Sequence, residues 1–183
     1  GFGWPDRADY LGWIQWVLSR CGKDVRITLH GVSMGGATVL MVSGEKLPPN
    51  VNAIVEDCGY TAVDAELGYQ IKRMYKIDDP AIIRDTSKLT KRRAGYSFEE
   101  ASALEQVKKS ITPTLFIHGE ADTFVPFDMV RELYDACPAP REIFTVPGAG
   151  HGLACAVDPE GYKKSVRNFL AKYLDPAYAP SGE

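Results

Sequence analysis

The sequence predicts an α/β fold in which a mainly parallel sheet is flanked by helices. Short apolar runs rich in β-branched residues alternate with longer segments whose apolar residues recur at helical spacing. The chain has 183 residues, of which 45% are hydrophobic, so one domain with a sizeable core is expected. A net charge of −3 gives no reason to expect a nucleic acid or an anionic membrane surface as partner.

Each element follows from a local pattern in the sequence. The predicted strands are residues 25–30, 51–55, 114–118 and 142–146. Helices are predicted over 6–20, 34–44 and 127–136. A last helix begins with Asp158 as the N-cap residue and Pro159 at the first helical position, and it extends to Leu174.

Residues 60–110 interrupt this alternation, because they contain helical patterns but no convincing strand. Ser97 followed by Glu100 has the form of a capping box and predicts a helix that extends to about residue 109. We expect 60–110 to be a helical insertion above the sheet. The core is then formed by 1–59 and 111–175, and 176–183 are expected to be a flexible tail.

The run Gly31-Val32-Ser33-Met34-Gly35 lies between a predicted strand and a predicted helix. A serine hydroxyl becomes a good nucleophile when a base removes its proton and a sharp strand-to-helix turn exposes its oxygen. Such a turn brings the residues two before and two after the serine together, so both are expected to be small. Ser33 is therefore the candidate nucleophile, and the Met34 N–H at the helix N-terminus is a candidate oxyanion donor.

The candidate acid and base are Asp122 and His151, which follow two consecutive predicted strands. The carboxyl ends of parallel strands meet at one edge of a sheet, where such sheets bind ligands. His151 lies in a glycine-flanked loop and is the preferred base, whereas His30 and His118 are interpreted as structural. Asp57 is the alternative acid.

Three motifs in this order resemble the α/β-hydrolase superfamily. They are Gly-Val-Ser-Met-Gly-Gly at 31–36, His-Gly-Glu-Ala-Asp-Thr-Phe-Val-Pro at 118–126 and Gly-Ala-Gly-His-Gly at 148–152. The chain most resembles the bacterial esterase and serine-aminopeptidase-like branch. The resemblance implies that Ser33 attacks an acyl carbon, that His151 acts as base and then acid, and that Asp122 orients His151. It also implies that 60–110 correspond to a lid over the acyl or leaving-group pocket.

The sequence departs from this superfamily at its beginning, because only one helix and one strand precede Ser33. Members usually have several earlier strands and a loop that supplies a second oxyanion donor, for which no residue is found here. We therefore expect the chain to be the C-terminal part of a larger hydrolase, or to pair with another segment or a second copy that completes the sheet.

The predicted function is that of a serine hydrolase that cleaves carboxylic esters, with amides or peptides as the near alternative. The substrate is then a small acyl compound, and no cofactor is expected. A catalytically silent fragment or binding module of a larger hydrolase is the competing hypothesis.

The four cysteines show no spacing typical of a metal site, and scattered reduced thiols are typical of an intracellular domain. We thus expect no metal and a cytoplasmic location. The thiol of Cys155, close in sequence to His151, is interpreted as incidental. A basic cluster at Lys88, Lys91, Arg92 and Arg93 is expected to be a solvated face. Trp4, Trp13 and Trp16 with Tyr10 are expected to pack the first helix against the sheet.

Overall fold

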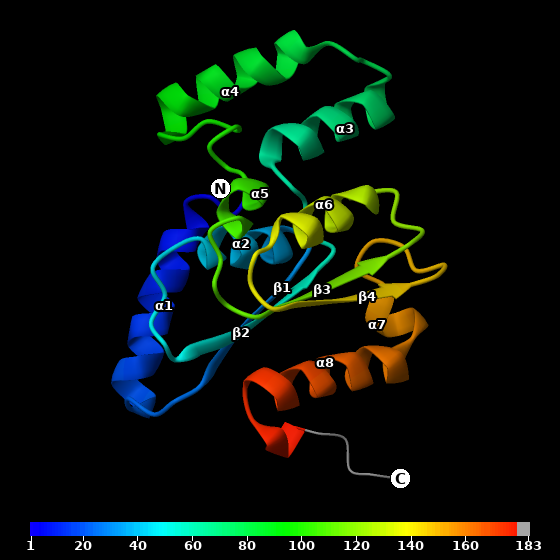
Figure 1. Cartoon of the computed structure of the whole chain (residues 1–183). Coiled ribbons are helices and arrows are strands. Elements are labelled where there is room, and N and C mark those ends of the chain that lie inside the picture. The colour runs from blue at the N-terminus through cyan, green and yellow to red at the C-terminus, as the bar shows by residue number, and fades with distance from the viewer. Residues whose placement is uncertain (179–183) are drawn as a thin grey trace.

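The computed structural model describes residues 1–178 and contains a four-stranded parallel sheet between layers of helices (Figure 1). The strands are β1 (Ile27–Val32), β2 (Val51–Asp57), β3 (Thr114–Gly119) and β4 (Arg141–Val146). They lie in sequence order across the sheet, and every neighbouring pair is parallel. Because parallel neighbours need a crossover, helices separate all four strands. The predicted α/β fold with a mainly parallel sheet is confirmed.

Outside 60–110 the helices of the described residues follow the predicted order, with one short addition, and within 60–110 three helices form. They are α1 (Asp6–Cys21), α2 (Met34–Ser43), α3 (Val63–Tyr75), α4 (Pro80–Ala94), α5 (Ala103–Val107), α6 (Asp128–Ala136), α7 (Ala154–Val157) and α8 (Pro159–Tyr173). The short helix α7 was not predicted. Of the expected tail, Pro176–Tyr178 forms a 3₁₀ turn, and 179–183 lie outside the described residues.

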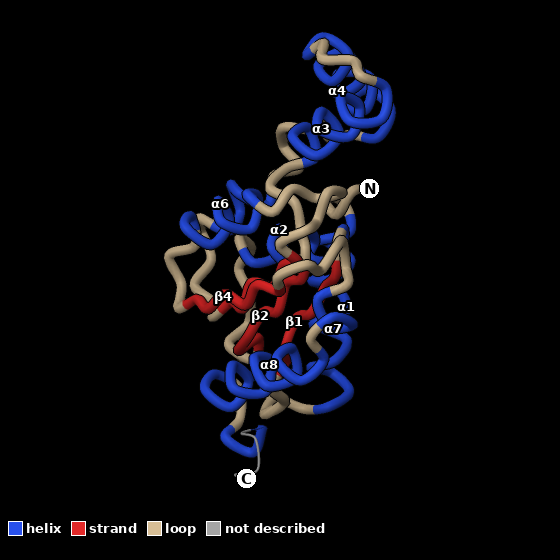
Figure 2. Tube along the Cα trace, turned by 90° about the vertical axis from the view of Figure 1, so that its right-hand side faces the viewer, coloured by secondary structure: helices blue, strands red, loops and turns tan. Residues whose placement is uncertain are grey.

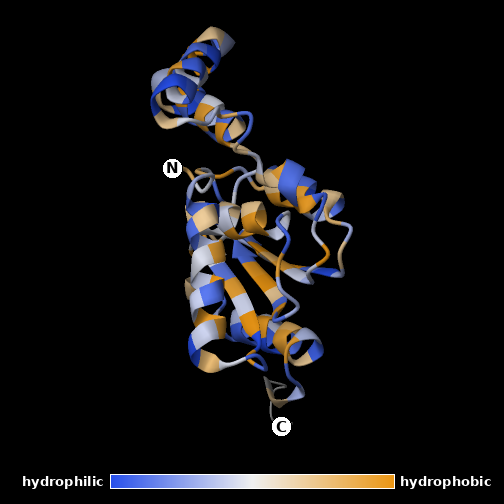
Figure 3. Ribbon diagram, turned by 90° about the vertical axis from the view of Figure 1, so that its left-hand side faces the viewer, coloured by the Kyte–Doolittle hydropathy of each residue, from blue (hydrophilic) through white to orange (hydrophobic). Residues whose placement is uncertain are grey.

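Helices lie on both faces of the sheet (Figure 2), and apolar clusters fill the space between the sheet and the helices. On one face, α2, α5 and α6 pack around Phe116, with Leu40 and Leu133 fully buried. On the other face, α8 inserts the fully buried Phe169 against Leu115 and Ile117. The strands are correspondingly apolar along most of their length, whereas the α3–α4 hairpin carries much hydrophilic surface (Figure 3). The packed core therefore fixes the positions of the carboxyl ends of β1 and β3.

The α3–α4 hairpin stands away from the sheet, beyond α2 and α6 (Figures 1 and 2). Its basic cluster is partly neutralised by exposed ion pairs, Lys88 with Asp85 and Lys91 with Glu100. No helix within residues 1–178 is long and apolar enough to cross a membrane.

The helix predicted from Ser97 to residue 109 is wrong in its extent. The capping box does form, since the Ser97 amide donates to Glu100 Oε2 at 2.8 Å and the Glu100 amide donates to Ser97 Oγ at 3.3 Å. It closes only one turn, because Ser102 pairs with Ala62 in an isolated antiparallel bridge that requires an extended backbone. Ser102 then caps the short helix α5, whose first residue is Ala103.

The expected aromatic face of the first helix is only partly correct. Trp4 is partly buried against the cluster on the α2 side of the sheet. Trp13 and Trp16 instead point outward, 63% and 50% exposed, and pack edge to face with ring centroids 5.7 Å apart. The helix is held by another face, on which Ile14 is buried and Tyr10 packs beside it.

Candidate active site

Ser33 occupies a strained position between the end of β1 and the start of α2. Its backbone has φ 58° and ψ −119°, a left-handed conformation that costs a non-glycine residue about 1–3 kcal/mol. The Ser33 amide donates to the Asp57 carbonyl at 2.7 Å, which anchors the turn to the neighbouring strand. Because Met34 begins α2, its N–H has no acceptor within the helix.

The glycines around Ser33 are not equally required, which corrects the expectation at Gly35. A Cβ on Gly31 would lie 2.1 Å from the Gly35 carbonyl oxygen, so Gly31 admits no side chain. A Cβ on Gly36 would lie 2.9 Å from the Asp57 carbonyl oxygen. A Cβ on Gly35 would meet nothing within 4 Å. The close approach of the turn therefore constrains Gly31 and Gly36 rather than the pair Gly31 and Gly35.

The fold brings Ser33, His151 and Asp122 into one hydrogen-bonded row. Ser33 Oγ lies 2.7 Å from His151 Nε2, and His151 Nδ1 lies 2.7 Å from Asp122 Oδ2. A carboxylate oxygen only accepts, so Nδ1 carries the hydrogen in that bond. In the neutral ring Nε2 is then free to accept the serine proton. The three residues come from loops after β1, β3 and β4.

Asp122 is buried, and both of its carboxylate oxygens have hydrogen-bond partners. Its Oδ1 accepts from the amides of Phe124 at 2.8 Å and Val125 at 3.0 Å, while Oδ2 faces the two histidines His151 and His118. Burial by itself raises the pKa of Asp122. Hydrogen bonds from His118, His151 and the Phe124 amide outweigh that effect and hold the pKa below its usual range. The carboxylate is therefore ionised at neutral pH.

His118 has a role that the sequence reasoning missed. It is fully buried, and its Nε2 lies 3.1 Å from the Val125 carbonyl oxygen and 3.3 Å from Asp122 Oδ2. Because a carbonyl oxygen only accepts, Nε2 carries the hydrogen and Asp122 is held from two sides by imidazoles. Its position four residues before Asp122, at the end of a strand, was the only signal in the sequence.

The remaining candidates lie apart from this row. Asp57, the alternative acid, accepts a hydrogen bond from the Tyr162 hydroxyl at 3.1 Å, and burial raises its pKa. His30 lies on an exposed position of β1. Asp122, rather than Asp57, is the carboxylate that contacts His151.

Among residues 1–178, Cys58, Asp122 and His151 form the group that could hold a metal ion, since their ligand atoms lie within 4.8 Å of one another. Two of these ligands are already hydrogen-bonded to each other. Burial strongly raises the pKa of the Cys58 thiol, with a further increase from the charge of Asp57. A thiolate is therefore disfavoured at Cys58, and Asp122 and His151 fit the hydrogen-bonded row with Ser33 better than a metal centre.

An apolar pocket of about 160 Å³ opens beside Ser33. Apolar side chains from α3 and from the loop after Asp122 form most of it, including Val63, Leu67 and Val125. Glu66 and Gln70 also line it, although each is more than nine-tenths buried. These two polar residues were not singled out from the sequence. The spacing i, i+4 on a helix that otherwise turns an apolar face inward could have identified them.

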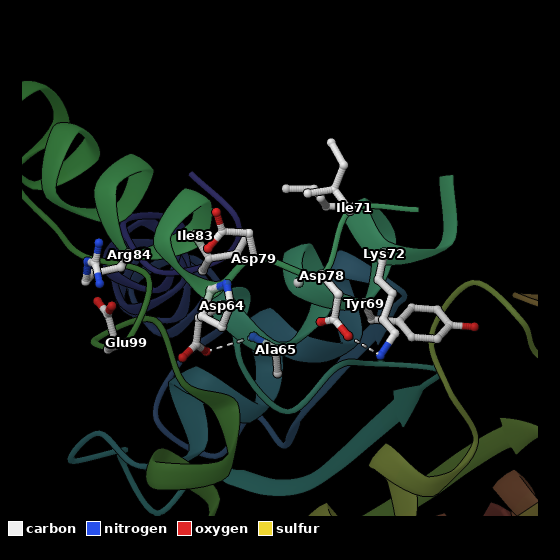
Figure 4. A pocket seen from close by; sticks show the side chains of 13 residues that line it. Asp64, Ala65, Tyr69, Ile71, Lys72, Asp78, Asp79, Ile83, Arg84 and Glu99 are labelled. Atoms are coloured by element: carbon white, nitrogen blue, oxygen red, sulfur yellow. Dashed lines mark hydrogen bonds and ion pairs between the residues drawn. The ribbon is translucent and has the colours of Figure 1, made fainter. Parts of the chain in front are cut away.

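A second hollow, of about 500 Å³, lies between α3 and α4 on another face of α3 (Figure 4). Charged side chains surround it, and Lys72 reaches Asp78 at 2.6 Å across its rim. It shares no residue with the apolar pocket beside Ser33.

Comparisons with known proteins agree with this fold. Residues 5–177 match the prolyl oligopeptidase family. YqkD of Bacillus subtilis is 27% identical over 174 residues, which cover 95% of this chain and 57% of YqkD. The chain thus spans little more than half the length of that relative.

Two solved structures share the fold at lower identity. An esterase of Pyrococcus furiosus superposes with a TM-score of 0.72 at 21% identity, over 95% of this chain and 64% of the esterase. An acylaminoacyl peptidase of Pyrococcus horikoshii superposes with a TM-score of 0.72 at 19% identity, over 94% of this chain and 28% of the peptidase. The family match covers nearly the whole described chain, and the sheet is parallel throughout. This chain therefore belongs to the prolyl oligopeptidase family within the α/β-hydrolase superfamily.

Proposed function

We propose that the protein is a serine hydrolase that forms an acyl-enzyme on Ser33. The observation that carries this proposal is the row of 2.7 Å contacts from Ser33 Oγ through His151 to Asp122. His151 removes the serine proton as Oγ attacks the acyl carbon, and it then returns that proton to the leaving group. Asp122 keeps the imidazole in the required tautomer and stabilises the imidazolium as it forms.

The negative charge that develops on the acyl oxygen needs donors beside Ser33. The Met34 N–H, at the N-terminus of α2, supplies one of them. Each such donor is worth a factor of about 10²–10³ in turnover. The activity of this chain therefore depends on which second hydrogen-bond donor, beside the Met34 N–H, faces the acyl oxygen.

Carboxylic esters of apolar acyl groups are the proposed substrates, with amides or peptides as the near alternative. The pocket of about 160 Å³ beside Ser33 has an apolar lining that suits a small acyl group or side chain. Residues 60–110 are proposed to act as a lid, because α3 supplies one wall of this pocket. A neutral small molecule is thus the expected partner.

A fluorophosphonate probe tests the proposal, because it reacts with an activated serine without needing the right substrate. The protein is expected to be labelled at Ser33, and Ser33→Ala is expected to lose the label. Ser43→Ala is a matched control, since Ser43 is a buried serine at the end of α2 that donates to the Leu40 carbonyl.

Two results would contradict the proposal. Labelling that persists in Ser33→Ala would place the reactive group elsewhere. A folded protein that is never labelled would support the competing hypothesis of a catalytically silent binding module.

A further inference from the structure

Glu66 and Gln70 lie one turn apart on α3, in the wall of the pocket beside Ser33. Their exposed fractions are only 7% and 8%. Gln70 Nε2 donates to Glu66 Oε1 at 2.8 Å and to the Phe124 carbonyl at 2.6 Å. A buried carboxyl group beside an apolar pocket is costly unless it is neutral or fully hydrogen-bonded, so the remaining atoms of this pair need an explanation.

Two oxygens of the pair are buried without a partner, Glu66 Oε2 and Gln70 Oε1. Both contacts of the Gln70 nitrogen are to oxygens that accept, so the amide orientation is determined and its oxygen is the unpartnered atom. One hydrogen placed between two unpartnered acceptors, on residues one helical turn apart, would satisfy both. A carboxylic acid supplies that hydrogen, because its O–H is a donor.

We propose that Glu66 is a neutral carboxylic acid in the active protein, that its Oε2–H donates to Gln70 Oε1, and that this pair is a positioning device for the catalytic acid. The two side chains then exchange two hydrogen bonds in a closed ring. The proposal rests on the proposed serine-hydrolase function, whose catalytic residues the pair does not touch directly.

Burial, more than the neighbouring charges, favours the neutral form of Glu66. Burial is the main cause that raises the pKa of Glu66 to about 7, and the charge of Asp122 adds to it. The hydrogen bond from Gln70 and the charge of Arg73 act in the opposite direction. The Tyr60 hydroxyl, on the loop before α3, also interacts with the charge of Glu66.

The pair is connected to the site through Phe124. Gln70 holds the Phe124 carbonyl, the Phe124 amide donates to Asp122 Oδ1 at 2.8 Å, and the Phe124 ring lies 4.9 Å from the His151 ring. When Glu66 loses its proton, the bond to Gln70 Oε1 is lost and a charge is left in an apolar wall. The restraint on Phe124 then weakens, and with it the alignment of Asp122 and His151.

The experiment compares pH profiles of kcat/KM for a neutral ester in the wild type and in Glu66→Gln. Glutamine at 66 makes the same two bonds with Gln70 but cannot ionise. The wild type is expected to lose activity above about pH 7, by up to tenfold per pH unit. In Glu66→Gln the decline above pH 7, measured relative to that variant's own maximum, is expected to disappear, with the acidic limb unchanged. Glu66→Leu, which makes neither bond, is expected to lower kcat more than it changes KM.

Glu105→Gln is the matched control, because Glu105 is an exposed glutamate on α5 of the same insertion. It is expected to keep the wild-type profile. A wild-type profile without an alkaline decline, or a decline that survives in Glu66→Gln, would overturn the proposal.

Infrared spectroscopy tests the protonation state without any turnover. The difference between wild type and Glu66→Gln at pH 6 is expected to contain one carboxylic-acid C=O band, which the wild type loses by pH 8.5. The buried Glu56 contributes equally to both proteins and cancels. If Ser33 is not labelled by the fluorophosphonate but this band is present, the proposed function fails while the neutral Glu66 stands. If the band is absent at pH 6, the inference fails whatever the activity.

Discussion

At the scale of single residues, the site depends on the turn at Ser33, which leaves almost no space for side chains on the residues around it. The left-handed backbone of Ser33 is tolerated because the Asp57 carbonyl and the first turn of α2 hold it on both sides. Gly31 lies against the Gly35 carbonyl so closely that no side chain fits. The motif read from the sequence predicts the turn, but it does not reveal which of its glycines is sterically required.

Gly31→Ala and Gly35→Ala are therefore expected to differ sharply. The first places a Cβ 2.1 Å from a carbonyl oxygen, so the turn must open, with a loss of several kcal/mol in the free energy of unfolding and loss of labelling at Ser33. The second meets nothing within 4 Å and is expected to fold with a thermal midpoint close to that of the wild type. Thermal unfolding followed by circular dichroism measures both. Equal destabilisation by the two variants would contradict this account of the turn.

At the scale of elements, helix ends show how far local sequence signals reach. Asp158 was identified as an N-cap from the sequence, and its side chain accepts from the Gly161 amide at 2.8 Å. The capping box at Ser97 was identified by the same kind of reasoning and also forms, yet its helix stops after one turn. The difference is the bridge between Ala62 and Ser102, which joins segments 40 residues apart and outweighs a cap worth about 1 kcal/mol.

Asp158→Ala is expected to lower the free energy of unfolding by about 1 kcal/mol, since it leaves helix amides without an acceptor. Because α8 buries Phe169 in the core, the loss is expected to appear as a fall of about 2–4 °C in the thermal midpoint. Asp79→Ala removes the equivalent cap of α4, whose side chains are mostly exposed, and is expected to shift the midpoint less. A larger effect from Asp79 would mean that the hairpin, rather than α8, limits stability.

At the scale of the whole molecule, buried carboxyl groups make stability depend on pH. The pKa of Glu66 has its ordinary value of 4.5 in the unfolded chain, and burial raises it to about 7 in the folded protein. Between these values the folded state keeps a proton that the unfolded state has released, so stability falls as pH rises through this window. Burial raises the pKa of Glu56 as well, in the same direction.

The free energy of unfolding of Glu66→Gln, relative to wild type, is expected to increase between pH 4.5 and 7 and to be constant above. The gain is up to about 3 kcal/mol, from the two pKa values of Glu66. Urea unfolding at pH 5, 6, 7 and 8 measures it, and Glu56 cancels in the comparison. A difference that is constant over this range would show that Glu66 has the same pKa in both states.

The sequence by itself determined the order of the four strands and of the helices α1, α2, α6 and α8, the strand-to-helix turn at Ser33, and the family motifs that contain Asp122 and His151. These follow from periodicity, capping and turn chemistry, which act within a few residues. Only the tertiary structure decided that α5 is short, that Trp13 and Trp16 face outward, that His118 supports Asp122, and that Glu66 pairs with Gln70 beside the pocket. The length of α5 depends on a bridge between segments far apart in the chain, which no local pattern encodes. The partners in the pairs His118 with Asp122 and Glu66 with Gln70 are each four residues apart, but their contacts depend on burial, which only the packed molecule decides.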